Sequence, residues 1–171
     1  MAERRHPNVV NVAEVEGRSF SQGSRFSATS RRLGLPTGGR QLGCSWYEVP
    51  AGKVAFPFHF HCANEEAVFV LEGEGSMRMG ADTVAVGPGD YIAHPVGPEH
   101  AHQLRNTGAG PLRYLVFSTM HLAEVVGYPD SKKIGAMASP SIEASARGEP
   151  WIRQLAFQSS AVGYYDGEDL G

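Results

Sequence analysis

Two histidines alternate along a short apolar stretch near the middle of the chain. His59 and His61 flank a phenylalanine, and the carboxylates of Glu65 and Glu66 follow within five residues. On an extended strand, side chains two positions apart point to the same side, so both imidazoles can approach one ion. Neutral imidazole is the commonest metal ligand among side chains, and a carboxylate can supply a third donor. This spacing predicts a metal site.

A second histidine-rich segment lies further along the chain and offers a fourth ligand. It reads HPVGPEHAHQLRN, from His94 to Asn106. Three histidines and one glutamate suit a borderline divalent metal, and Zn, Fe, Ni and Mn all accept such donors. We therefore expect one divalent ion per chain, of a kind that the sequence leaves open.

Short strands separated by glycines and prolines must position these residues. The chain of 171 residues holds 21 Gly and 11 Pro, and from residue 41 strand-like apolar segments recur at roughly ten-residue spacing. The expected strands cover 41–49, 54–61, 66–73, 76–80, 82–86, 91–94, 101–106 and 112–118. This pattern is typical of an all-β sandwich or barrel, and the length predicts one domain.

The segments on either side of this region have weaker patterns. Residues 1–40 predict an N-terminal extension that packs on the barrel, and residues 119–171 predict a short, partly helical C-terminal extension. Within the second extension we expect a short helix at 119–127, a surface loop over 128–150 with one helical turn at 141–147, and a strand at 161–169.

Composition argues against several classes of partner. The net charge is −3 and the arginines form no dense cluster, so nucleic acid is not expected. The N-terminal residues lack the apolar region of a signal peptide, and no apolar run approaches the ~18 residues of a membrane span. Two cysteines, Cys44 and Cys62, do not form a disulfide framework. We therefore expect a cytoplasmic protein.

The first histidine segment resembles the first sequence motif of the cupin superfamily. That motif orders a glycine, a His-x-His pair, a glutamate and a second glycine, and the matching residues are Gly52, His59, His61, Glu66 and Gly73. The resemblance implies Glu66 as the ligand and leaves Glu65 in the loop, solvated or supporting an imidazole. Strand parity then places Val68 and Val70 on the same inner face as Glu66.

The second segment resembles the second cupin motif and leaves two candidates for the fourth ligand. Counting from Pro95 and Gly97 gives His100, whereas counting back from Asn106 gives His102. Extra residues are tolerated more easily in a loop than within a paired strand. We therefore expect His102 to be the ligand, with His100 at the mouth of the barrel.

The resemblance covers residues 41–118 and implies a cupin-type double-stranded β-helix, a jelly-roll barrel with the metal inside. The finer pattern is similar to small bacterial single-domain cupins, some of which carry sugar-phosphate isomerase labels. It implies a metal-dependent isomerase acting on a sugar-phosphate-like molecule. An Fe(II)-dependent dioxygenase and a non-catalytic cupin that binds or senses a small ligand are the alternatives.

Proton transfer in such a site needs a further ionisable group near the ion. The candidates are His100, His94 and Tyr91, followed by Tyr114 and Glu48. Each also has a structural explanation, since His94, for example, can simply end its strand before Pro95.

The N-terminal half offers more apolar surface than one small barrel needs. Residues 1–40 and 41–49 carry this surplus, and cupins commonly pair by exchanging edge strands, which also covers the open edge. We therefore expect a homodimer.

Overall fold

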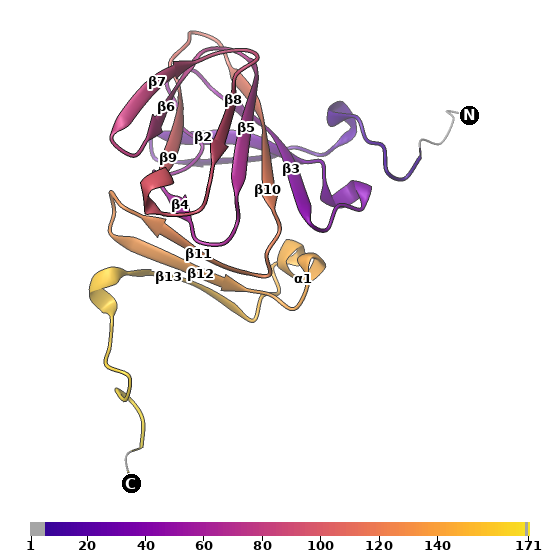
Figure 1. Cartoon of the computed structure of the whole chain (residues 1–171). Coiled ribbons are helices and arrows are strands. Elements are labelled where there is room, and N and C mark those ends of the chain that lie inside the picture. Colours follow the sequence, from indigo (N-terminus) through magenta and orange to yellow (C-terminus); the bar gives the residue numbers. More distant parts are fainter. Residues whose placement is uncertain (1–5, 170) are drawn as a thin grey trace.

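A barrel of antiparallel strands, with a further sheet across one end, forms the body of the protein (Figure 1). The structure is a computed structural model and describes residues 6–169 and 171. Its elements are almost all strands, with one α-helix and four short 3-10 helices, at Val12–Glu14, Leu35–Thr37, Pro98–His100 and Gln158–Ser160. The expected all-β barrel is confirmed.

A six-stranded antiparallel sheet, in the order β1-β2-β3-β10-β5-β8, forms the larger wall of the barrel. Its strands are β1 (Arg18–Gln22), β2 (Phe26–Arg32), β3 (Leu42–Val49), β5 (Glu66–Glu72), β8 (Tyr91–His94) and β10 (Leu112–Thr119). Strand β10 lies in the middle of this sheet, where it pairs with β3 on one side and with β5 on the other. The described part of the N-terminal segment therefore supplies two strands of this sheet.

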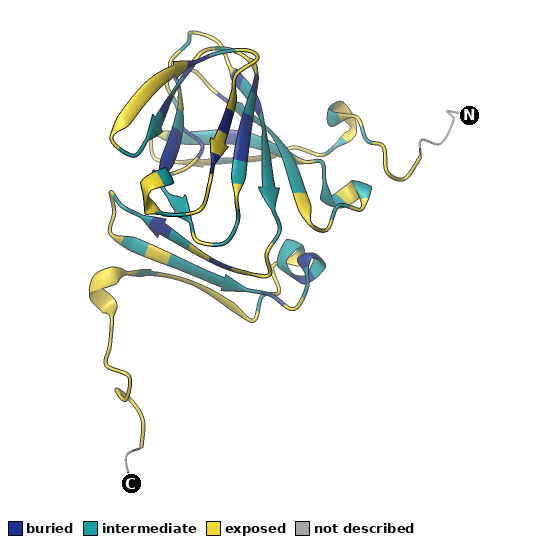
Figure 2. Ribbon diagram, viewed as in Figure 1, coloured by how far each residue is buried: buried dark blue, intermediate teal, exposed yellow. Residues whose placement is uncertain are grey.

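A three-stranded sheet, in the order β7-β6-β9, closes the barrel on the other side. It consists of β6 (Gly75–Met79), β7 (Asp82–Val86) and β9 (His102–Asn106). The core lies between the two walls, where Val49, Val70, Met77 and Leu112 are at most 1% exposed. Figure 2 shows the buried residues gathered in these strands. Fully burying an aliphatic side chain contributes about 1.5–3 kcal/mol, so this layer stabilises the barrel.

One turn between the walls depends on a glycine. Gly73 ends strand β5 with a φ of 88°, a left-handed conformation that side chains with a Cβ rarely adopt. A Cβ at this position would also lie 2.5 Å from the carbonyl oxygen of Pro111. The second glycine of the first histidine motif is thus required by the backbone itself.

The third sheet, in the order β13-β12-β11-β4, lies across the end of the barrel that carries the histidines. It contains β4 (Phe60–His61), β11 (Ala123–Tyr128), β12 (Lys133–Ala138) and β13 (Ile152–Phe157). Residue 61 of β4 pairs with Val126 of β11. Gly127 permits this pairing, because a Cβ there would collide with the ring of Phe60.

This sheet corrects most of the expectations for the C-terminal segment. The helix expected at 119–127 is wrong, since strand β11 occupies this region, and the loop expected over 128–150 contains strand β12. Residues 161–169, all of which the structure describes, form turns and irregular structure in place of the expected strand. Residues such as Val125 and Val126 favour an extended backbone, and pairing with β4 and β12 decides their conformation.

The helical turn expected at 141–147 is confirmed as helix α1 (Ile142–Arg147). The side chain of Ser141 accepts a hydrogen bond from the backbone N–H of Ala144 at 3.1 Å, which caps the first turn. Gly148 ends the helix in a left-handed conformation with a φ of 77°. Within the described part of the chain, no helix is long and apolar enough to cross a membrane.

Candidate metal centre

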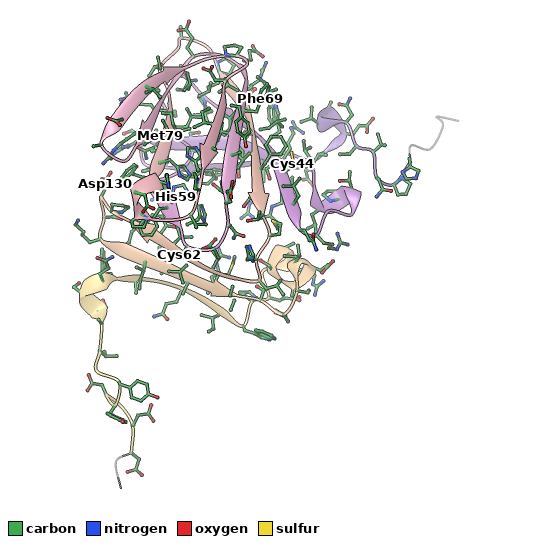
Figure 3. All side chains as sticks on the ribbon, in the orientation of Figure 1. Cys44, His59, Cys62, Phe69, Met79 and Asp130 are labelled. Atoms are coloured by element: carbon green, nitrogen blue, oxygen red, sulfur yellow. The ribbon has the colours of Figure 1, made fainter. Side chains whose placement is uncertain are left out.

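Four side chains converge on one point inside the barrel. His59, His61, Glu66 and His102 each offer one donor atom, and these four atoms lie within 4.8 Å of one another. The carboxylate oxygen Oε2 of Glu66 lies 3.4 Å from Nε2 of His61 and 3.6 Å from Nε2 of His102. Figure 3 shows His59 in the interior, between the barrel strands and the sheet that contains β11 and β12.

Three different strand pairings bring these ligands together. Glu66 begins β5, and His102 begins β9 in the opposite wall. His59 and His102 form an isolated antiparallel bridge, in which each backbone N–H donates to the other residue's carbonyl, at 3.2 and 2.8 Å. His61 lies on β4, which is held by β11. The barrel supplies three of the four ligands from two walls, and the third sheet anchors the fourth.

Hydrogen bonds fix which nitrogen of each imidazole faces the centre. Nδ1 of His59 donates to the carbonyl of Pro57 at 2.8 Å, and Nδ1 of His102 donates to the carbonyl of His100 at 3.0 Å. A carbonyl only accepts, so both Nε2 atoms keep a lone pair directed inward. Nδ1 of His61 faces a carboxylate oxygen of Glu124 at 3.3 Å, which leaves its Nε2 in the same role.

The donor set fits a divalent metal ion. Among the residues that the structure describes, the buried Nε2 of His61 has no hydrogen-bond partner. A buried nitrogen of this kind normally finds a partner, and a metal ion at the centre would supply one. Three imidazole nitrogens and one carboxylate oxygen match the preferences of Zn, Fe, Ni and Mn.

The electrostatics of the cluster favour the forms that bind metal. Burial, reinforced by His102 and His61, lowers the pKa of His59 to about 4, so this ring is neutral near pH 7. Burial alone would raise the pKa of Glu66, but the imidazoles of His102 and His61 outweigh it and lower that pKa. Burial alone would lower the pKa of His61, but the carboxylates of Glu66 and Glu124 raise it. A bound cation would reverse that last effect and favour the neutral ring.

A cavity of about 230 Å³ opens beside the cluster. Besides the four candidate ligands it is lined by aromatic, aliphatic and amide side chains: Tyr47, Ala55, Phe56, Val68, Met77, Gln103, Leu104, Tyr114 and Val116. None of the described residues that line it is a lysine or an arginine. A second cavity, of about 270 Å³, shares Tyr47, Glu66 and Val116 with the first and reaches Arg32 and helix α1.

The alternative ligand candidates from the sequence lie in different places in the structure. His102 is in the cluster, whereas the side chain of His100 is 41% exposed and lies beside Glu99. His100 ends the 3-10 helix Pro98–His100, so the extra residues lie in the loop before β9, as expected. Glu66 is in the cluster, and Glu65 is exposed, with its backbone N–H bonded to Thr119.

The proton-transfer candidates fall into different environments. His94 is 2% exposed and stacks against His102, while Tyr114 is buried and lines the cavity. Tyr91 is 64% exposed and, like His100, does not line either cavity beside the cluster. Glu48 pairs with Arg113 at 2.7 Å. Only His94 and Tyr114 of this group lie next to the cluster.

Two residues that the sequence did not indicate are part of the site. Tyr47 lines both cavities, and strand parity with the buried Val49 could have placed it inside the barrel. Glu124 is 5% exposed and contacts His61. It lies in a segment that the sequence predicts as helix, so no sequence signal pointed to it.

Comparison with known families gives one match over the barrel. Residues 45–118 match the family model described as the cupin domain. This range contains all four candidate ligands.

Two curated relatives match parts of the chain. Dimethylsulfoniopropionate lyase DddQ of Ruegeria pomeroyi is 38% identical over 87 residues, which is 49% of this chain and 41% of that protein. Quercetin 2,3-dioxygenase of Bacillus subtilis is 28% identical over 76 residues, which is 44% of this chain and 23% of that protein. The chain thus matches less than half the length of either relative.

Solved structures share the fold over most of the chain. A putative sugar phosphate isomerase from Acidithiobacillus ferrooxidans has a TM-score of 0.76 at 23% identity, covering 92% of this chain and 96% of that one. The crystal structure of DddQ from Ruegeria pomeroyi has a TM-score of 0.52 at 29% identity, covering 68% and 61%. At 23% identity the first likeness concerns the fold alone.

Proposed function

Because the chain contains a cupin domain over residues 45–118, with a histidine–glutamate cluster suited to a metal ion inside it, we propose that the protein is a metal-dependent enzyme acting on a small organic molecule. The ion is held by His59, His61, Glu66 and His102. The proposed reaction removes a proton from a carbon next to a carbonyl or carboxylate group, a step that isomerases and lyases can share.

The observation that carries this proposal is the orientation of the imidazoles beside a largely apolar cavity. Three Nε2 atoms and one carboxylate oxygen face one point, and aromatic and aliphatic side chains line the adjoining space. When bound, a divalent ion supplies a Lewis acid that polarises a substrate oxygen. The apolar lining limits competing water and strengthens electrostatic interactions in the cavity.

Tyr47 is the side chain best placed to move a proton. It lines both cavities beside the cluster. Burial raises the pKa of its phenol and the charge of Glu66 raises it further, while the charge of Arg32 lowers it. The hydroxyl therefore lies within electrostatic reach of both charges. Tyr114 stacks on Tyr47 with ring centroids 5.4 Å apart, which holds the Tyr47 ring in place.

The lining of the cavity also bears on the substrate. Phosphate groups are usually held by arginine, lysine or clustered backbone N–H groups, and no described residue lining the first cavity is an arginine or a lysine. We therefore propose a substrate without a phosphate group, in place of the sugar-phosphate-like molecule that the sequence resemblance implies. Arg32, which lines the second cavity, could hold a carboxylate at the far end of the substrate.

A dioxygenase is the second candidate function. The same three-histidine, one-glutamate donor set suits Fe(II), and the chain is similar over 76 residues to a protein named quercetin 2,3-dioxygenase. In that case the ion would activate dioxygen, and no proton-moving side chain would be needed at Tyr47.

Hydrogen–deuterium exchange separates the two functions. The protein, loaded in turn with Zn, Mn, Ni and anaerobic Fe(II), is incubated in D₂O with a panel of small carboxylic acids and ketones, and NMR follows exchange of the C–H next to the carbonyl group. We expect exchange by the loaded protein, and a loss of roughly 100-fold or more in Tyr47→Phe, as for removal of a side chain that transfers a proton. The matched control is Tyr164→Phe, because Tyr164 is 89% exposed.

Two outcomes contradict the first proposal. Oxygen uptake by the iron-loaded protein without exchange indicates the dioxygenase. Neither exchange nor oxygen uptake with any of the four metals indicates a protein that binds its ligand without turnover.

A further inference from the structure

Glu124 is a buried carboxylate beside the metal centre that comes from outside the matched domain. It lies on β11, and its side chain is 4% exposed. The matched family model ends at residue 118, so this carboxylate belongs to the C-terminal segment. A buried carboxylate is costly unless hydrogen bonds compensate for the lost hydration, so its partners indicate what it does.

Five N–H groups surround this one carboxylate. Oε1 accepts from the backbone N–H of Cys62 at 3.1 Å, of Ala63 at 3.0 Å and of Val125 at 2.8 Å. Oε2 accepts from the backbone N–H of Asn64 at 2.7 Å and faces Nδ1 of His61 at 3.3 Å. An ionised carboxylate only accepts hydrogen bonds, which suits a set made entirely of donors.

The position of these donors connects Glu124 to two metal ligands at once. The loop of residues 62–65 joins His61 to the strand that starts at Glu66, so its conformation sets the separation of the two ligands. The carboxylate accepts from three of the four backbone N–H groups of this loop and also contacts the ring of His61. A partner on Nδ1 orients the ring and directs the Nε2 lone pair toward the ion.

We propose that Glu124 is a positioning residue of the metal centre, which holds His61 in its metal-binding tautomer and sets the loop between His61 and Glu66. This inference rests on the proposed metal site. The C-terminal sheet would then help to position the metal ligands, because β11 supplies the Glu124 carboxylate and also pairs with β4, which carries His61.

Glu124→Gln tests the proposal with little change in volume. A glutamine amide has one acceptor oxygen and one donor NH₂ group, so it cannot satisfy five N–H groups in either orientation. With NH₂ toward Asn64 and His61, the ring loses its acceptor. With NH₂ toward Cys62, Ala63 and Val125, the backbone N–H groups of these three residues lose the oxygen that accepts from them. In both cases we expect Zn²⁺ to bind about 10–100-fold more weakly, as for other partners of ligating histidines.

The measurement is Zn²⁺ affinity of the full chain by competition with a chromophoric chelator, with circular dichroism to verify the fold. The matched control is Glu149→Gln, an exposed carboxylate whose partner is Arg147, and its affinity should equal that of the parent. Nitrogen-15 NMR of the metal-free protein reports the tautomer of His61, and we expect Nδ1–H in the parent and a mixture in Glu124→Gln.

Glu124→Asp serves if the glutamine variant does not fold. It keeps the anion for the loop but withdraws the carboxylate from His61, so Zn²⁺ affinity should again fall while the fold is retained. Affinity within twofold of the parent, together with an unchanged His61 tautomer, would overturn the proposal and leave Glu124 with a purely structural role. If the parent binds no Zn²⁺, the proposed function fails. The His61 tautomer in the metal-free parent and variants then tests separately whether Glu124 positions this ring.

Discussion

The imidazole ring of His94 lies flat against that of His102, with ring centroids 3.7 Å apart and an angle of 14° between the ring planes. His94 ends β8, and His102 begins β9, so the contact joins the two walls of the barrel. The described structure gives the buried Nε2 of His94 no hydrogen-bond partner. His94 therefore acts as a flat support that limits movement of the His102 ring.

Two substitutions of His94 should show whether its flat shape or its ring nitrogens matter for Zn²⁺ binding. His94→Phe keeps a flat ring and should bind Zn²⁺ within a few-fold of the parent. His94→Ala removes the support and leaves a void, which should lower stability by about 2–4 kcal/mol and weaken Zn²⁺ binding more than His94→Phe does. Urea unfolding and chelator competition measure the two effects. Equal Zn²⁺ affinities for the two variants would contradict a supporting role.

The metal-free protein should lose stability as the pH falls through the acid range. Burial lowers the pKa of His59 to about 4 and that of His94 to about 3, both below the unfolded value of 6.5. Groups with depressed pKa values in the folded state contribute stability above the unfolded pKa, and this contribution is lost as the pH falls from about 6.5 toward 3.

Two other residues of the cluster affect this profile. The pKa of Glu66 is also lowered, so protonation of this carboxylate adds a further loss of stability at more acidic pH. The pKa of His61 is raised, so protonation of this ring favours the folded state as the pH falls. Urea unfolding from pH 7.5 to 4 should show a net fall in stability, with a shallower slope in His94→Phe. An equal slope for parent and variant would contradict the contribution assigned to His94.

The purified protein should carry close to one divalent ion per chain. The four converging donors motivate this expectation, and elemental analysis by mass spectrometry measures it. The double substitution of alanine for His59 and His61 should abolish binding while circular dichroism stays that of the parent, because neither histidine belongs to the buried hydrophobic core. Metal at 100 times its Kd should stabilise the parent by about 2.7 kcal/mol. No binding of Zn, Mn, Fe or Ni to the parent would refute the site.

His100 and His102 should respond differently to substitution. His102→Ala should weaken metal binding by 100-fold or more, since one of four donors disappears. His100→Ala should bind metal like the parent, because the His100 side chain is 41% exposed, lies beside Glu99 and is not part of the cluster. Isothermal titration with Zn²⁺ compares them. The reverse order of affinities would mean that the ligand assignment is wrong.

The homodimer expected from the sequence stays a prediction. In the structure, strand β13 and the residues around it leave large apolar side chains exposed, with Trp151 at 74% and Leu155 and Phe157 at 58%, and β13 ends its sheet. Such an edge invites pairing with a second chain. Light scattering at micromolar concentration should give twice the chain mass of 18.4 kDa, and a value near 18.4 kDa would exclude the dimer.

The fold and most of the ligand cluster could be predicted from the sequence, because they depend on local patterns. Alternation along a strand placed Glu66, Val68 and Val70 on one face, and the structure has Glu66 in the cluster with both valines buried. The tolerance of loops for extra residues favoured His102 over His100. The resemblance to the cupin motifs implied Glu66 and the two histidine candidates, and the strand period and the tolerance of loops are local properties that a few neighbouring residues determine.

Tertiary structure alone decided what surrounds the cluster. Strand β11 begins more than 60 residues after His61, and its short run of Ala, Glu, Val and Gly is compatible with helix or strand. Pairing with β4 and β12 makes it a strand and turns Glu124 inward beneath His61. Which distant strand pairs with β4 depends on the energy of contacts across the whole molecule, and no local period along the chain encodes that choice.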